Sequence, residues 1–189
     1  MSSRILSRAY FQRPTLTVAR SLIGKYLVRK NGRATRAGRI VEVEAYIGME
    51  DRACHASKGR TARTDVMFGP AGVAYVYLIY GMYHCFNIVT ERVGYPSAVL
   101  VRAVEDERTG ALIDGPGRIC RFLAIDRTLN RVDLTEGDVL WVEDRGERAA
   151  PSVITVGRRI GVDYAGVWAK KPWRFRLARS KKLNVKSKK

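Results

Sequence analysis

Residues 72–90, GVAYVYLIYGMYHCFNIVT, decide the fold because they contain the clearest strand pattern in the chain. Aromatic and β-branched residues alternate at a period of two in the first half, which is typical of a half-buried strand. Gly81 then allows a tight reversal into residues 83–89. The sequence therefore predicts a long β-hairpin with its tip at Tyr80, Gly81 and Met82.

The predicted tip carries two large apolar side chains, Tyr80 and Met82, where polar residues are usual. Such a tip either packs on its own protein or inserts into another molecule. The hairpin alone favours the first interpretation. The charge of the rest of the chain shifts the balance toward the second.

The chain is strongly basic. Its 189 residues contain 35 Lys and Arg against 18 Asp and Glu, a formal charge of +17. An excess of this size points first to nucleic acid and second to an anionic membrane surface. No stretch is long and apolar enough to span a membrane, and the N-terminus lacks the apolar core of a signal peptide. We therefore expect an intracellular protein that does not associate with membranes.

Cysteine usage argues against a disulfide framework and against a metal site. Cys54, Cys85 and Cys120 are odd in number and widely spaced. Cys54 precedes His55 and Cys85 follows His84, but neither pair has the short ligand spacing of a zinc motif. We expect no bound metal.

The remaining segments predict a single domain, residues 1–189, with a basic and mobile tail from about residue 178. Most strands are linked as hairpins, which favours an α+β fold: a curved antiparallel β-sheet, flanking short helices and the protruding hairpin. Strands are expected at residues 26–30, 37–46, 98–105, 139–144, 153–160 and 172–177, helices at 16–26 and 118–125, and connections at 47–70 and 161–171.

Two carboxylates interrupt the apolar strand at residues 37–46. At a period of two, Glu42 and Glu44 share one face with Ile40. Carboxylates in such a strand of a basic protein indicate either a charged site or a solvated face paired with surface lysines and arginines. This segment alone does not choose between the two.

Arg102 favours the charged site. It stands in the apolar strand at residues 98–105, where the pattern places it on one face with Leu100 and Val104. A guanidinium in such a strand requires an acceptor, because a buried unpaired charge is costly. Glu44 or Glu42 is the best-matched partner. A carboxylate–arginine pair in a partly dry site is a common setting for a catalytic carboxylate.

The loop at residues 47–70 contains His55 and the basic run KGRTART, with Arg60 and Arg63. Glycine and hydroxyl residues among arginines suit phosphate contacts, although a solvated basic loop has the same composition. Residues 115–117, GPG, precede a predicted helix with Arg118 in its first turn, a weak motif for a second phosphate contact.

Several separated motifs, in order, resemble the alkyladenine (3-methyladenine) DNA glycosylase family of the mammalian type, from about residue 16 to residue 177. The matching segments are GRIVEVEAYIG, the His55 loop, GPAGVAYVYLIYGMY, VLVRAVE, DGPGRICRFLAI and RIGVDYAGVWAKKPWRF. The resemblance implies a monofunctional base-excision-repair enzyme. It would flip alkylated or deaminated purines out of duplex DNA and hydrolyse the N-glycosidic bond, leaving an abasic site.

The resemblance also implies roles for individual residues. Glu44 would activate the water, and Arg102 would help to hold the water and the carboxylate. The flipped purine would lie between Tyr77 on one side and Tyr46 with His55 on the other. Tyr80 would fill the gap left in the stack, Met82 would support it in the minor groove, Asn87 would oppose the 2-amino group of guanine, and Arg118 would lie near the DNA backbone.

The same resemblance implies that no metal or organic cofactor is needed and that the protein works as a monomer on double-stranded DNA containing damaged purines. It would act in the cytoplasm or nucleoid of a bacterium, or in a nucleus. The chain departs from the family at His84, where an aromatic or apolar residue is more usual, and in lacking an N-terminal extension.

Three other functions fit the sequence less well. A noncatalytic RNA- or single-strand-binding module would use tyrosines as stacking platforms, but it would not need Glu44 and Arg102. A deaminase lacks support because His55-Ala56-Ser57 has no glutamate and the Pro-Cys-x-x-Cys motif is absent. A glycosylase-lyase would need an amine nucleophile in the pocket, and the family pattern places none there.

Overall fold

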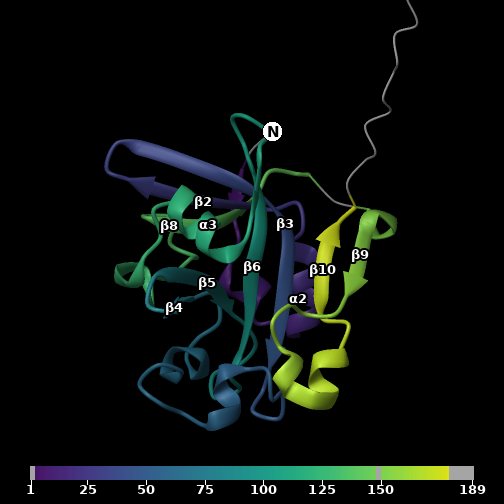
Figure 1. Cartoon of the computed structure of the whole chain (residues 1–189). Coiled ribbons are helices and arrows are strands. Elements are labelled where there is room, and N and C mark those ends of the chain that lie inside the picture. The colour runs from purple at the N-terminus through teal and green to yellow at the C-terminus, as the bar shows by residue number, and fades with distance from the viewer. Residues whose placement is uncertain (1–2, 148–149, 179–189) are drawn as a thin grey trace, which may run out of the picture.

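The computed structural model of the chain describes residues 3–147 and 150–178. Its strands form one strongly curled antiparallel sheet, in the order β1-β8-β2-β3-β6-β5-β4, with β7 paired to β6, β10 paired to β3 and β9 paired to β10 (Figure 1). Short helices flank the sheet, so the expected α+β fold is confirmed. The predicted tail, residues 179–189, lies outside the described residues.

The strands are β1 (Arg4–Ile5), β2 (Tyr26–Asn31), β3 (Ala34–Ile47), β4 (Ala74–Ile79), β5 (Tyr83–Val89), β6 (Ser97–Asp106), β7 (Leu112–Asp114), β8 (Leu140–Asp144), β9 (Ile154–Gly157) and β10 (Arg174–Leu177). The α-helices are α1 (Arg8–Phe11), α2 (Thr15–Leu22) and α3 (Pro116–Phe122). Single turns of 3-10 helix are η1 (His55–Lys58), η2 (Asp65–Phe68), η3 (Arg127–Leu129) and η4 (Pro151–Val153), and η5 (Asp163–Lys170) is longer.

The long strand β3 organises the site. Its first part pairs with β2, its second part pairs with β10, and β6 runs along its other edge. In Figure 1, β3 and β6 lie side by side through the centre, and the segment at residues 47–70 and the turns of η5 meet at one end of them. Both carboxylates, Glu42 and Glu44, therefore stand on a strand that is hydrogen-bonded along both edges.

A β-bulge between β3 and β6 makes some of their side chains face the opposite side of the sheet from the one predicted. The register shifts between Ile40 and Glu42, and again between Glu42 and Val43. Because a bulge moves the following side chains to the other face, Ile40 joins Val43 in the core instead of sharing a face with the carboxylates. Val104 likewise packs in the core, so the prediction that it shares a face with Arg102 was wrong.

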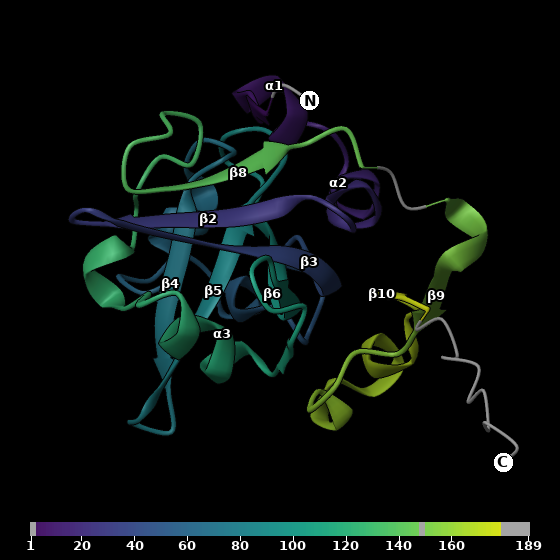
Figure 2. The same cartoon turned by 90° about the horizontal axis from the view of Figure 1, so that it is seen from above.

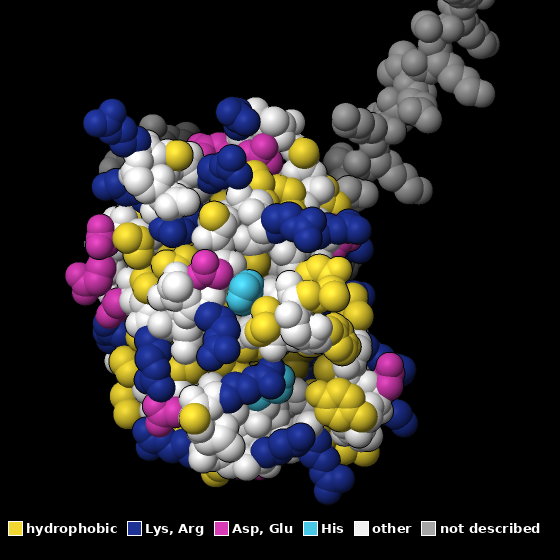
Figure 3. Space-filling view, turned by 60° about the vertical axis from the view of Figure 1, so that its left-hand side comes forward, with side chains coloured by type: hydrophobic (Ala, Val, Ile, Leu, Met, Phe, Trp, Pro, Cys, Tyr) yellow, Lys and Arg dark blue, Asp and Glu magenta, His cyan; other side chains and the backbone are white. Residues whose placement is uncertain are grey.

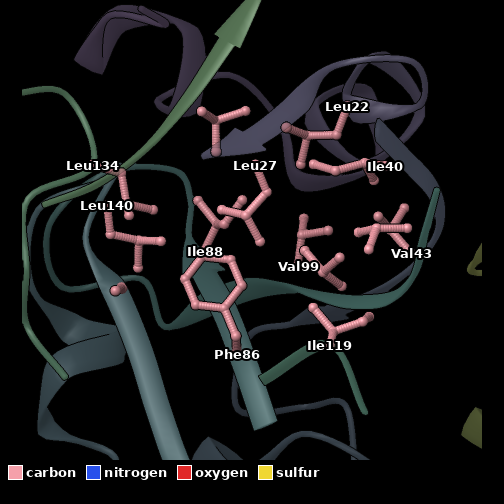
Figure 4. Close-up of a cluster of buried hydrophobic side chains, with 14 of the residues drawn as sticks. Leu22, Leu27, Ile40, Val43, Phe86, Ile88, Val99, Ile119, Leu134 and Leu140 are labelled. Atoms are coloured by element: carbon pink, nitrogen blue, oxygen red, sulfur yellow. The ribbon is translucent and has the colours of Figure 1, made fainter. Parts of the chain in front are cut away.

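The main core lies inside the curl of the sheet, under α2 and α3. Ile40, Phe86, Ile88, Val99 and Ile119 are nearly or fully buried there, in the cluster of side chains drawn in Figure 4. β-Branched and aromatic residues fill the concave face because they pack well on a pleated surface.

Four segments differ from their predicted bounds or conformation. The helix expected over 16–26 ends at Leu22, because Gly24 takes a left-handed φ of 89° and Tyr26 already pairs in β2. The strand expected over 153–160 ends at Gly157. The loop at 47–70 contains η1 and η2 around a buried cluster, and the connection at 161–171 contains η5. None of the described helices has the length and apolar character needed to cross a membrane.

Candidate active site

A pocket with a volume of about 140 Å³ opens at the end of β3 and β6. Tyr46, His55, Tyr77, Asn87 and Arg102 all line it, so the structure brings together five of the residues singled out from the sequence. A cavity of about 150 Å³ holds one benzene ring, so a small planar ligand fits the scale of this pocket.

Glu44 is fully buried and accepts hydrogen bonds from three described residues. Its Oε1 accepts from the Ile160 amide at 2.8 Å, and its Oε2 accepts from the Tyr46 hydroxyl at 2.9 Å and from Arg102 Nη1 at 3.3 Å. Burial raises the pKa of Glu44, although Arg102, the Ile160 amide and Tyr46 act in the opposite direction. A carboxylate with a raised pKa is better matched to general-base catalysis near neutral pH.

Glu42 serves a cluster of arginines instead. Its Oε1 lies 3.5 Å from Arg102 Nε and 3.6 Å from Arg174 Nη1, and its Oε2 lies 3.4 Å from Arg176 Nε. Arg102 therefore contacts both carboxylates, which confirms that it pairs with β3. Glu42 is surrounded by three guanidiniums, whereas Glu44 is hydrogen-bonded to Tyr46 and to the Ile160 amide, and both of those residues line the pocket. These partners favour Glu44 as the carboxylate of the site.

The aromatic walls are in direct contact. The rings of His55 and Tyr77 are 4.7 Å apart and edge-to-face, with an interplanar angle of 73°. Tyr75 lies behind them and joins its hydroxyl to His55 Nδ1 at 2.9 Å. A base stacked between two rings would separate them to roughly twice the ~3.5 Å contact distance. The expected sandwich between His55 and Tyr77 is therefore not open in this structure.

His55 is expected to be neutral at physiological pH. Burial, followed by the positive charges of Arg63 and Lys58, lowers its pKa from 6.5 to about 4. A neutral imidazole keeps its π-face available for stacking and adds no charge to the pocket wall.

This depressed pKa predicts a pH-dependent stability. Between pH 4 and 6.5 the unfolded chain binds more protons at His55 than the folded chain, so stability rises with pH across that interval. We expect the thermal midpoint to rise from about pH 4 to 6.5, and His55→Asn to remove part of that rise. Calorimetry of both proteins at several pH values measures it; identical slopes would assign the rise to other groups.

The predicted hairpin of β4 and β5 is confirmed, and its tip projects from the body in Figure 2. The turn residues Tyr80 and Gly81 have φ of 53° and 70°, and the Met82 amide donates to Ile79 O at 3.2 Å, as in a type I′ turn. Tyr80 is 84% exposed and Met82 is 66% exposed. The structure thus contradicts packing of the tip on its own core. His84 lies beside the tip, in a groove along α3.

Asn87 is buried at the pocket wall. Its amide nitrogen donates to the backbone oxygen of Tyr75 at 3.1 Å and approaches that of Cys85 at 3.5 Å. These bonds fix the side chain on strand β5. Asn87 lines the pocket, and its predicted contact with a purine edge stays a prediction.

The predicted phosphate contacts are exposed but differ in their partners. Arg60 pairs with Asp65 at 2.7 Å, whereas the Arg63 guanidinium lies over the Tyr77 ring, 4.7 Å from its centroid. Arg118 lies in the first turn of α3 and donates to Asp114 O at 3.4 Å. Lys and Arg side chains, in dark blue, are spread over the face drawn in Figure 3, with apolar side chains between them.

A buried ion pair that the sequence analysis missed supports the pocket from behind. Arg159 donates to both carboxylate oxygens of Asp51, at 2.5 and 2.8 Å, and to the backbone oxygens of Ala45 and Trp168. Its guanidinium also stacks on Tyr46, 4.7 Å from the ring centroid. The next residue, Ile160, supplies the amide bound to Glu44. The sequence feature that could have indicated this ion pair is the arginine at the end of the strand-like segment VITVGRR.

Other missed residues line the pocket mouth. Tyr164, on η5, is 73% exposed, whereas Met67, on η2, is a buried part of the same lining. In residues 3–147 and 150–178, no three His, Cys, Asp or Glu side chains are grouped as a metal site would require. Cys54, Cys85 and Cys120 are buried free thiols.

A buried carboxylate beside an aromatic pocket, next to an exposed aromatic hairpin on a basic surface, is the arrangement expected of an enzyme that acts on single bases of DNA. Three proteins named "Putative 3-methyladenine DNA glycosylase" are similar to this chain. The one from Myxococcus xanthus is 54% identical over 173 residues, which is 90% of this chain and 88% of that protein. Those from Methanocella arvoryzae and Legionella pneumophila (strain Corby) are 51% and 50% identical, covering 90% and 91% of this chain and 91% and 93% of theirs.

Residues 9–181 match the methylpurine-DNA glycosylase family, and the chain belongs to that family. It is therefore a DNA glycosylase, a hydrolase of N-glycosyl bonds that acts in DNA repair.

Proposed function

We propose that this protein excises damaged purines, including 3-methyladenine, by flipping the nucleotide out of duplex DNA and hydrolysing its N-glycosidic bond with an activated water. The observation that carries the proposal is Glu44, a fully buried carboxylate with a raised pKa, hydrogen-bonded to three residues of the pocket lining, Tyr46, Arg102 and Ile160. A base cannot be attacked inside the stack, so the pocket requires extrusion of the nucleotide.

The hydrogen bonds of Glu44 indicate where the water binds. Each carboxylate oxygen accepts at about two positions. Among the described residues, Tyr46 and Arg102 use both positions of Oε2, whereas the Ile160 amide alone donates to Oε1. The second position of Oε1 is therefore the one at which a water would donate. Glu44 would take its proton while stabilising the oxocarbenium-like sugar that forms as the bond breaks.

Entry of a purine requires the His55 ring to move away from Tyr77. Their present centroid separation of 4.7 Å must increase by roughly 2 Å to admit a stacked base. His55 lies in η1, outside the strands of the sheet, so its displacement leaves the backbone of Glu44 in place. Tyr46 is less free, because its hydroxyl is bound to Glu44 and its ring is stacked on Arg159.

A panel of duplexes tests the function. Each contains one 3-methyladenine, 7-methylguanine, hypoxanthine or ethenoadenine, and excision is read as strand cleavage after alkali. We expect release of at least 3-methyladenine, with the abasic strand intact before alkali and no enzyme–DNA adduct trapped by borohydride. Release of none of the four bases would refute the proposal. A trapped adduct would show that an amine of the protein, and not water, is the nucleophile. We further propose that a monomer suffices, since one chain supplies the whole pocket.

Tyr80 predicts a second outcome. Tyr80→Ser should raise the cost of holding the extruded state by roughly 1–3 kcal/mol, the scale of one base–aromatic stack. Loss of excision should be greatest for well-paired lesions and least for mismatched ones. Because Tyr80 is 84% exposed, the melting temperature should not fall. Equal loss on every substrate together with a lower melting temperature would contradict a wedge.

A further inference from the structure

Arg63, in the basic run of the 47–70 loop, lies on an aromatic wall of the pocket. Its guanidinium carbon lies 4.7 Å from the centroid of the Tyr77 ring, and no described carboxylate forms an ion pair with it. Arg60, three residues earlier, is neutralised by Asp65 at 2.7 Å, and Asp65 also binds Arg131 at 2.6 Å. Of these two exposed arginines of one loop, Arg60 is paired with a described carboxylate and Arg63 is not.

Tyr77 is a wall of the pocket, so the charge of Arg63 reaches whatever base stacks there. A ring attracts a cation through its quadrupole, and a guanidinium on the ring already uses that attraction. A base on the opposite face of Tyr77 would share the ring with the guanidinium. A base on the same face would have to displace it. Either arrangement costs more for a base that is itself positively charged.

We propose that Arg63 is a specificity-determining residue that disfavours cationic lesions relative to neutral ones. Alkylation at N3 or N7 leaves a purine with a fixed positive charge, whereas hypoxanthine and ethenoadenine are neutral. The Arg63 guanidinium is in direct contact with this wall, and burial lowers the pKa of the neighbouring His55 to about 4, so that His55 adds little positive charge at neutral pH. This inference rests on the proposed excision of damaged purines.

The test is a competition between 7-methylguanine and hypoxanthine duplexes in one reaction. The ratio of the two excision rates equals the ratio of kcat/KM values and does not depend on the fraction of active protein. Arg63→Gln, which removes the charge but keeps the length, should raise the ratio of cationic to neutral excision about three- to ten-fold. Spontaneous loss of 7-methylguanine is subtracted from a reaction without enzyme.

Two matched variants separate charge at the pocket from charge on the loop. Arg63→Lys keeps the charge and should leave the ratio near that of the unaltered protein. Arg60→Gln removes one charge from the same loop, away from Tyr77, and should slow both reactions equally. An unchanged ratio in Arg63→Gln, with both rates lowered, would make Arg63 a phosphate contact and overturn the inference. Absence of both activities in the unaltered protein would instead refute the proposed function.

Discussion

Glu44→Gln is expected to lower the single-turnover rate of base excision by at least about 100-fold, the lower range for loss of a general base. The amide keeps the size of the side chain, and its oxygen can still accept from Tyr46 and Arg102. Its nitrogen faces the Ile160 amide, from which it can accept no hydrogen bond, and the proposed water, from which it can take no proton. Binding to lesion DNA should persist, because the aromatic walls and the basic surface are unchanged.

Glu42→Gln is the matched control, since it alters a neighbouring carboxylate of the same strand. Glu42 pairs with Arg102, Arg174 and Arg176, whereas Tyr46 and the Ile160 amide bind Glu44, so the rate of the Glu42 variant should fall far less. In the unaltered protein the rate should decline on acidification through the raised pKa of Glu44, because the deprotonated form is the base. A near-normal rate in Glu44→Gln combined with a large loss in Glu42→Gln would reverse the assignment.

Folding should survive the Glu44 substitution. A folded-state pKa above the unfolded value means that ionised Glu44 lowers stability as pH rises through that interval. The neutral amide carries no such cost, which offsets the bond lost at Ile160. We expect the melting temperatures to differ by only a few degrees, a change of about 1 kcal/mol or less. A thermal melt beside the kinetics separates loss of catalysis from loss of structure.

Arg159→Met should have the largest effect on stability. It leaves Asp51 buried without its partner, a situation that costs roughly 3–5 kcal/mol. For a domain of this size the melting temperature should fall by about 6–20 °C. The exposed pair of Arg60 and Asp65 is the control, because Arg60→Met should cost less than about 1 kcal/mol.

A double replacement distinguishes stability from positioning. Asp51→Leu with Arg159→Met removes both charges, which should restore much of the stability. Excision should remain impaired, because Tyr46 loses the guanidinium on its ring and the backbone next to Ile160 loses the hydrogen bonds from Arg159 to Ala45 and Trp168. Recovery of both stability and single-turnover rate in the double variant would show that the pair is structural only.

The hairpin and the pairing of Arg102 with the β3 carboxylates were predictable because local rules decide them. Alternation identifies β4 and β5, Gly81 permits the turn, and a lone arginine in an apolar strand needs an acceptor. The choice of Glu44 over Glu42 was not predictable from periodicity, since both occupy the same face. It came from the family resemblance, and the hydrogen bonds of the two carboxylates now support it.

The remaining features depend on long-range contacts that no local pattern encodes. Asp51 and Arg159 are separated by 108 residues and meet only because β10 and η5 pack beside the end of β3. The bulge at Ile40 arises between two strands, so the period of one strand does not reveal it. The edge-to-face contact of His55 with Tyr77 depends on how the 47–70 segment folds back over β4.

Because β3 is paired with both β6 and β10, the site residues on these strands should tolerate mutation less than the site residues on segments outside the sheet. Glu44 and Arg102 stand on strands whose backbones are tied into the sheet, whereas His55, Arg63 and Tyr164 stand on segments outside it. Substitutions in those segments alter the outline of the pocket without shifting the strand that carries Glu44, the proposed catalytic carboxylate. Descendants of this chain can therefore acquire new damage spectra through surface segments alone, while the bond-breaking chemistry is inherited unchanged.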